Sequence, residues 1–73
     1  MILPAQCRAA RALLNWTLPN LAQEAKVSVS TINSFELGRR QPIPANLSAI
    51  QRALEAQGIE FTDGEAPGVR LRK

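Results

Sequence analysis

The spacing of helix-ending signals constrains this chain more than any other feature. Asn15 can adopt the left-handed conformation that ends a helix, and Gly38 and Gly58 supply two further stops. A fourth break is predicted at Lys26 and Val27. Between these signals the apolar residues recur at three- and four-residue spacing, as one buried helical face requires. The pattern predicts four short helices, over about residues 4–14, 18–25, 28–37 and 45–57.

Cap residues and prolines support the ends of these helices. Pro4 suits the first turn of a helix, and the side chains of Thr17 and Ser28 can accept hydrogen bonds from the helices that follow them. Two prolines exclude a continuous helix across residues 39–44, which are therefore predicted to form a loop.

The last part of the chain changes from helical spacing to alternation. Residues 59–62 and 69–72 each alternate apolar and polar side chains, around a turn-rich segment at 63–68. We predict a β-hairpin that packs on the rest of the chain, because an isolated hairpin is only marginally stable. The expected fold is mainly α, with four helices over 1–58 and a C-terminal β-hairpin over 59–73.

Composition excludes several classes of function. The chain has 73 residues, enough for one domain at most, and it holds a lone Cys7 and no histidine. An internal disulfide is therefore impossible, and the usual zinc ligands and the usual near-neutral acid-base group are missing. Because the carboxylates are scattered and no nucleophile and base can be paired, we expect no enzymatic activity, no metal or cofactor and no small-molecule substrate. Cys7 is predicted to be a small buried hydrophobe.

The N-terminal residues do not form a targeting pattern. Met1, Ile2 and Leu3 are followed at once by Pro4 and polar residues, so the apolar stretch is too short for a signal peptide or a membrane span. We therefore expect a cytoplasmic protein with no membrane partner.

The charge of the chain is unevenly distributed. The formal net charge is +3; residues 1–40 hold five basic and two acidic residues, whereas residues 41–73 hold four of each sign. A basic first half is compatible with a nucleic acid partner. A charge of this size is also common on the solvated surface of small domains. The charge alone therefore does not distinguish a nucleic-acid-binding protein from other small domains, and the pattern of residues is needed.

The two middle helices are joined by only a few residues, in the stretch LPNLAQEAKVSVSTINSFELG. A helix pair linked so tightly crosses steeply, and the first helix holds the second outward so that its polar side can enter a DNA major groove. This stretch resembles the lambda-repressor and Cro type of helix-turn-helix proteins, also called the XRE family. The resemblance covers about residues 8–54 and rests on the joint spacing of Thr17, Leu21, Ala22, Ala25, Val27, Ser28, Ile32, Glu36, Gly38, Arg39, Arg40 and Pro42.

The resemblance implies a role for each of several residues, with double-stranded DNA as the partner. The helix that starts at Ser28 becomes the recognition helix, and its implied base-reading residues are Val29, Ser30, Asn33 and Ser34. The implied phosphate contacts are Arg39 and Arg40, which follow that helix, together with Thr17 and Lys26. Arg11 and Glu36 are implied to form a structural ion pair between the first and third helices.

Three positions depart from the family pattern, and the mildest is Pro19, which is uncommon so early in the second helix but is tolerated in its first turn. The family usually has glutamine where this chain has Leu18, so one side-chain contact to DNA is lost and an apolar residue stands there instead. It usually has glycine where Lys26 stands, and a left-handed conformation of a residue with a Cβ costs on the order of 1 kcal/mol.

The combined expectation is a transcriptional regulator, specifically a repressor that binds a palindromic operator as a homodimer. One short recognition helix buries too little surface to select a single genomic site, so a second copy is expected. The predicted dimer contact is the apolar face of the hairpin, formed by Ile59, Phe61, Val69 and Leu71, although the same face could instead cover the chain's own fourth helix. The alternative function is a protein-interaction module on the same scaffold, such as an antitoxin or a bridging coactivator.

Overall fold

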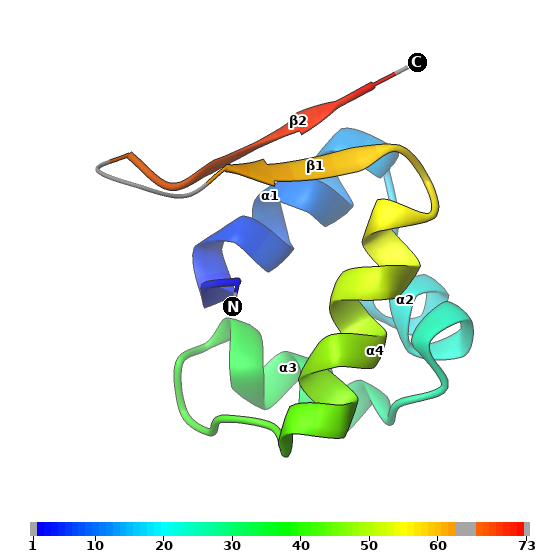
Figure 1. Ribbon diagram of the computed structural model, residues 1–73. Coiled ribbons are helices and arrows are strands. Elements are labelled where there is room, and N and C mark those ends of the chain that lie inside the picture. The colour runs from blue at the N-terminus through cyan, green and yellow to red at the C-terminus, as the bar shows by residue number, and fades with distance from the viewer. Residues whose placement is uncertain (1, 63–65, 73) are drawn as a thin grey trace.

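The computed structural model describes residues 2–62 and 66–72 (Figure 1). Its four helices are followed by two antiparallel strands, which confirms the predicted fold class. None of the helices in the described ranges is both long and apolar enough to cross a membrane. The elements are α1 (Pro4–Leu14), α2 (Leu18–Ala25), α3 (Val29–Glu36), α4 (Pro44–Glu55), β1 (Ile59–Thr62) and β2 (Gly68–Leu71).

The predicted bounds of α1, α2 and β1 are confirmed, and those of α3, α4 and β2 differ by one or two residues. Ser28 and Leu37 are the caps of α3, so the regular helix is shorter than the predicted 28–37. Helix α4 begins at Pro44, one residue earlier than predicted, because the first turn of a helix has no use for the N–H group that proline lacks. It ends at Glu55 rather than at 57, and β2 covers 68–71 rather than 69–72. The predicted turn at 63–68 lies partly outside the described residues.

Local hydrogen bonds fix the starts of α2 and α3, as the cap residues predicted. The Thr17 hydroxyl accepts from the Asn20 N–H at 3.2 Å, and the Asn20 side-chain oxygen accepts from the Thr17 N–H at 3.0 Å. The Ser28 hydroxyl accepts from the Thr31 N–H at 3.1 Å. These reciprocal and single caps satisfy backbone donors that have no partner inside the helix.

The hydrophobic core lies between the four helices and the first residue of the hairpin. Its largest fully buried side chains come from every helix, so no helix pair has a core of its own. Burial of one such side chain stabilises the fold by about 1.5–3 kcal/mol, and this accounts for the cohesion of helices too short to be stable alone. These side chains are Cys7, Leu21, Ile32, Phe35, Leu47, Ile50 and Leu54.

The hairpin turns its apolar face onto the chain's own helices. The strands pair with Ile59 opposite Leu71 and with Phe61 opposite Val69, so all four side chains share one face. Ile59 is 2% exposed, and the other three are partly buried against the core. Figure 1 shows the hairpin lying across α1 and the end of α4. The face predicted as a dimer contact thus packs on α1 and α4 of its own chain, more on α1 than on the fourth helix named as the alternative, while Phe61, Val69 and Leu71 stay partly exposed.

Two residues fix the hairpin in place: Gln6, which sequence reasoning missed, and Gly58, which it identified only as a helix stop. Gln6 is buried in α1, and its side-chain N–H groups donate to the carbonyl oxygens of Thr62 and Gly68 at 3.1 and 3.0 Å. Gly58 has a φ of 96°, and a Cβ there would lie 2.5 Å from the carbonyl oxygen of Arg72. Only glycine allows this close crossing of the two strand ends.

Lys26 ends α2 in the left-handed conformation, with φ 58° and ψ 42°. Lys26→Gly is expected to stabilise the fold by about 0.5–1 kcal/mol, because relief of the steric strain exceeds the entropy that glycine adds to the unfolded chain. Urea unfolding measures this gain. Lys26→Ala is the matched control, since it removes the charge and keeps the strain. An equal gain in both variants would contradict the strain argument.

Candidate nucleic-acid interface

The turn between α2 and α3 is short, and one of its residues is buried in the core. Three residues, 26–28, separate the helices, and Val27 in their middle is buried. The Val27 N–H donates to the Ala22 carbonyl at 3.1 Å, which closes the end of α2. The chain therefore leaves α2 and enters α3 in one fixed direction.

Helix α3 divides into an inner and an outer side. Ile32 and Phe35 are 0% and 1% exposed, and they hold the helix onto the core. On the other side Val29, Ser30 and Asn33 are exposed and Ser34 is partly exposed. The structure thus presents the four predicted base-reading residues on the outer side of the helix, where a partner could reach them.

Arg11 and Glu36 form the predicted ion pair beneath α3. The Arg11 Nε donates to Glu36 Oε2 at 2.7 Å, and its Nη2 donates to Oε1 at 2.6 Å, in the two-pronged geometry that favours arginine with carboxylate. The hydrogen bond to Glu36 raises the pKa of Arg11, so the guanidinium stays charged. The third donor, Nη1, reaches the Trp16 carbonyl at 3.0 Å and thereby ties the start of α2 to the same group.

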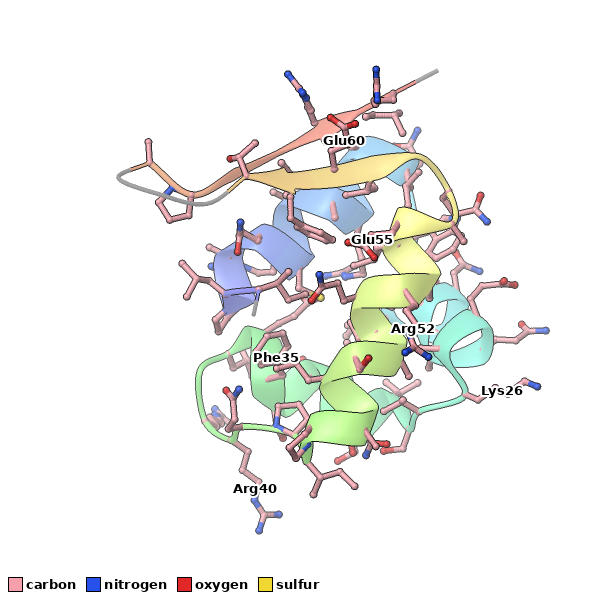
Figure 2. The ribbon with its side chains drawn as sticks, viewed as in Figure 1. Lys26, Phe35, Arg40, Arg52, Glu55 and Glu60 are labelled. Atoms are coloured by element: carbon pink, nitrogen blue, oxygen red, sulfur yellow. The ribbon has the colours of Figure 1, made fainter. Side chains whose placement is uncertain are left out.

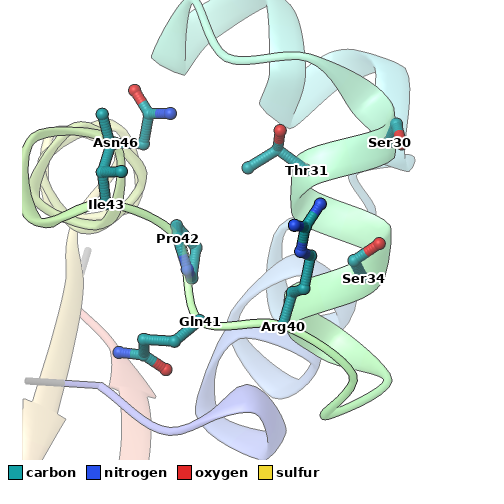
Figure 3. A pocket seen from close by; sticks show the side chains of 8 residues that line it. All are labelled: Ser30, Thr31, Ser34, Arg40, Gln41, Pro42, Ile43 and Asn46. Atoms are coloured by element: carbon teal, nitrogen blue, oxygen red, sulfur yellow. The ribbon is translucent and has the colours of Figure 1, made fainter.

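A groove of about 340 Å³ runs beside α3, between that helix and the start of α4 (Figure 3). Figure 3 shows the Arg40 side chain in this groove beside Thr31 and Ser34, with Asn46 on the opposite wall. Its described lining contains one cation and no carboxylate, so the groove is suited to an anion. The full lining is Ser30, Thr31, Ser34, Arg40, Gln41, Pro42, Ile43 and Asn46.

Sequence reasoning missed the residues that α4 and the preceding loop add to this groove. Gln41, Ile43 and Asn46 line the groove, but none of them is among the residues on which the family resemblance rests. Pro42 is buried and turns the loop back, so the first turn of α4 comes to face α3. Pro42 and Pro44 were the available sequence signal for this part of the groove. They predict that residues 39–44 form a loop, but they do not predict the direction in which the loop runs.

Cations stand at both ends of α3. Lys26 lies before the helix and Arg39 and Arg40 lie after it, and all three are exposed. Figure 2 shows Lys26 and Arg40 pointing away from the body of the molecule. None of them has an ion-pair partner in the described part of the chain, whereas Arg70 and Arg72 both pair with Glu60 on the outer face of the hairpin. Three exposed cations without an ion-pair partner in the described ranges therefore flank α3, and Arg52 on α4 is a further one.

The N-terminus of α2 offers less than the sequence suggested. The Thr17 N–H donates to Asn20 and the Thr17 hydroxyl accepts from Asn20, so the Leu18 N–H is the backbone donor left among the described first-turn residues, and the Thr17 hydroxyl can still donate its own proton. The Leu18 side chain is partly buried against the core. A phosphate at this end could meet the Leu18 N–H and the Thr17 hydroxyl.

Metal-ligating side chains do not cluster in the described ranges. Across residues 2–62 and 66–72, no three His, Cys, Asp or Glu side chains gather where they could hold a metal ion. The outer side of α3 carries hydroxyl, amide and apolar groups, which bind by hydrogen bonds and contact.

Comparison with known proteins agrees with this geometry. Residues 8–60 of the 73 match a family model described as Helix-turn-helix, so the match includes the α2–turn–α3 unit and the groove. No curated protein matches the chain. The chain is therefore a member of the helix-turn-helix family of the lambda-repressor and Cro type, the XRE family, and is a DNA-binding regulator.

Proposed function

We propose that the chain is a transcriptional repressor that binds a palindromic operator as a homodimer, with α3 in the major groove. The observation that carries the proposal is the outer side of α3, where hydroxyl and amide side chains are exposed between unpaired cations. A major groove admits one helix of this kind and presents a distinct pattern of donors and acceptors for each base pair.

Base reading is assigned to the exposed residues of α3. The Asn33 amide can form two hydrogen bonds with adenine, and the Val29 side chain can contact a thymine methyl group. Ser30 and Ser34 can donate or accept, so they discriminate between bases more weakly. Asn33 is thus the strongest reader in this set.

Affinity is assigned to phosphate contacts at the two ends of α3. Arg39 and Arg40 contact phosphates of the DNA strand that passes the protein groove between α3 and α4. Lys26 contacts phosphates of the DNA at the other end of α3. Helix α3 has eight residues and is about 12 Å long, which is comparable to the width of the DNA major groove. Cations at its two ends can therefore reach the phosphates on the two sides of that groove. The N-terminus of α2, at Thr17 and Leu18, adds a backbone N–H to a phosphate.

The homodimer is proposed to form at an edge of the hairpin. The apolar face of the hairpin is occupied by the chain's own core, so it is not free for a second copy. Each strand of a two-stranded sheet has an outer edge with backbone groups that no strand pairs. A second copy could add its strand there and leave both cores intact.

The alternative of a protein-interaction module has less support. Its argument from the sequence was the apolar Leu18 at a position where the family places a DNA contact. That side chain packs partly against the core, so little of it is offered to a protein partner.

Selection of preferred sites from random duplex DNA tests the proposal. We expect an enriched palindrome whose half-sites lie about one helical turn, roughly 10 base pairs, apart. Asn33→Ala is expected to relax the preference at one position of each half-site, with a discrimination loss of about 1–3 kcal/mol. Gln23→Ala is the matched control, because Gln23 is an exposed amide on α2 and outside the groove lining.

Three outcomes would count against these assignments. Enrichment of no sequence would contradict sequence-specific binding. Enrichment of single, unpaired half-sites would contradict the homodimer. An unchanged preference in Asn33→Ala would contradict base reading by that residue.

A further inference from the structure

Three side chains of α1 converge on one residue of α3. The Cys7 thiol donates to Glu36 Oε2 at 3.1 Å, and Arg11 donates to both carboxylate oxygens. The Arg8 Nη1 donates to the Glu36 backbone carbonyl. Cys7 and Arg11 lie one helical turn apart on the same side of α1, and Arg8 lies next to Cys7.

These contacts hold Glu36 by its side chain and by its backbone at once. Glu36 is the last residue of α3, where carbonyl groups lack helical partners and the helix dipole is negative. The Arg8 cation satisfies that carbonyl and complements the dipole. The carboxylate is 4% exposed, and in the described part of the chain every buried side-chain nitrogen and oxygen has a hydrogen-bond partner.

The thiol is suited to act as a permanent donor. Cys7 is completely buried, so its side chain has no room to turn away from Glu36. Burial raises the pKa of the Cys7 thiol far above its ordinary value, and the hydrogen bond to Glu36 raises the pKa further. The sulfur therefore keeps its proton, and Cys7 is more than the space-filling hydrophobe that the sequence predicted.

We propose that Cys7 and Arg8 are positioning residues which, with Arg11, set the angle at which the recognition helix stands on α1. The proposal rests on the proposed function. Apolar packing of Ile32 and Phe35 fixes α3 on the core, but hydrophobic contact does not depend on orientation. Hydrogen bonds depend on angle, so the bonds to Glu36 at the end of α3 restrict how the helix can rotate. Because α3 is about 12 Å long, a rotation of about 5° around Glu36 moves its first residue by about 1 Å, enough to break a hydrogen bond to a base.

Two matched pairs of variants test this role. At position 7, Cys7→Ser keeps a hydrogen-bond donor and Cys7→Ala removes it, and serine and alanine have nearly equal volumes. At position 8, which is exposed, Arg8→Lys keeps a cationic donor and Arg8→Met removes it. We measure affinity for the duplex that the parent protein selects and for an unselected duplex of the same length, at a temperature where circular dichroism shows every variant folded.

We expect Cys7→Ala and Arg8→Met to bind the selected duplex about fivefold more weakly. Their affinity for unselected duplex should stay within about twofold, since that binding rests on phosphate contacts. Cys7→Ser and Arg8→Lys should restore selected binding to within about twofold of the parent. A merely structural role would lower both affinities together, and equal binding by the serine and alanine variants would overturn the donor role of Cys7.

Residual dipolar couplings of the free protein give a readout that needs no DNA. We expect the orientation of α3 relative to α1 to change in Cys7→Ala and Arg8→Met and to be kept in Cys7→Ser and Arg8→Lys. An unchanged orientation in all four variants overturns the positioning role, whatever the protein binds. A parent protein that selects no sequence while the orientation changes as expected would instead contradict the proposed function alone.

Discussion

Glu36→Ala is expected to destabilise the fold by about 3–5 kcal/mol. The variant leaves the Arg11 guanidinium partly buried without its carboxylate, and it strands the Cys7 donor in the core. A domain of this size has a total stability of roughly 4–11 kcal/mol, so a loss of this size unfolds a large fraction of the molecules. Urea unfolding followed by circular dichroism measures it.

The double variant Arg11→Met with Glu36→Leu is the control for this prediction. It removes both charges and keeps apolar bulk in their place, and its stability is expected to lie within about 1 kcal/mol of the parent or above it. Comparison with Glu36→Leu alone, which keeps the same side chain at position 36, gives the cost of leaving Arg11 unpaired, apart from the Arg11–Trp16 hydrogen bond that the double variant also loses. A loss of less than about 1 kcal/mol in Glu36→Ala would show that the pair is dispensable to the fold.

Arg39→Ala combined with Arg40→Ala is expected to weaken DNA binding about thirtyfold at physiological salt. Each phosphate contact releases about 0.9 counterion, so the slope of log K against log salt should fall by about 1.8 in the double variant. The loss should be similar for selected and unselected duplex, because these side chains read no bases. Electrophoretic or fluorescence titrations at several salt concentrations measure both quantities.

The charge-matched control is Arg52→Ala, compared with Arg40→Ala alone. Arg52 is exposed on α4, and it takes no part in the groove lining (Figure 2). We expect a change of slope near zero for Arg52→Ala and near 0.9 for Arg40→Ala. Equal slopes in both variants would mean that net charge, and not the position of the cation, controls binding.

Much of this fold could be predicted because its signals are local. Thr17 and Ser28 each cap a helix by bonding to a group three residues away, so the cap is encoded within one turn. Asn15 and Lys26 end their helices in the left-handed conformation at the predicted places. The ion pair between Arg11 and Glu36 spans 25 residues, and only the family resemblance supplied it.

The use of the hairpin could not be predicted from its alternation. Alternation identifies an apolar face, but the same four side chains can bury themselves on their own helices or on a second copy. The choice depends on whether the connection after α4 lets the strands fold back. Gly58 and the two hydrogen bonds from Gln6 decide this, and those hydrogen bonds join segments more than fifty residues apart.

By itself the sequence determined the four helices, their caps, the recognition segment and the excess of positive charge in the first half, since each depends on neighbours within a few residues or on simple counting. Tertiary structure alone decided the groove between α3 and α4, the inward turn of the hairpin and the contacts by which Cys7 and Arg8 join Arg11 on Glu36. Those features depend on the directions in which distant segments of the chain pack together. The order of residues in a sequence specifies their spacing along the chain but not those directions.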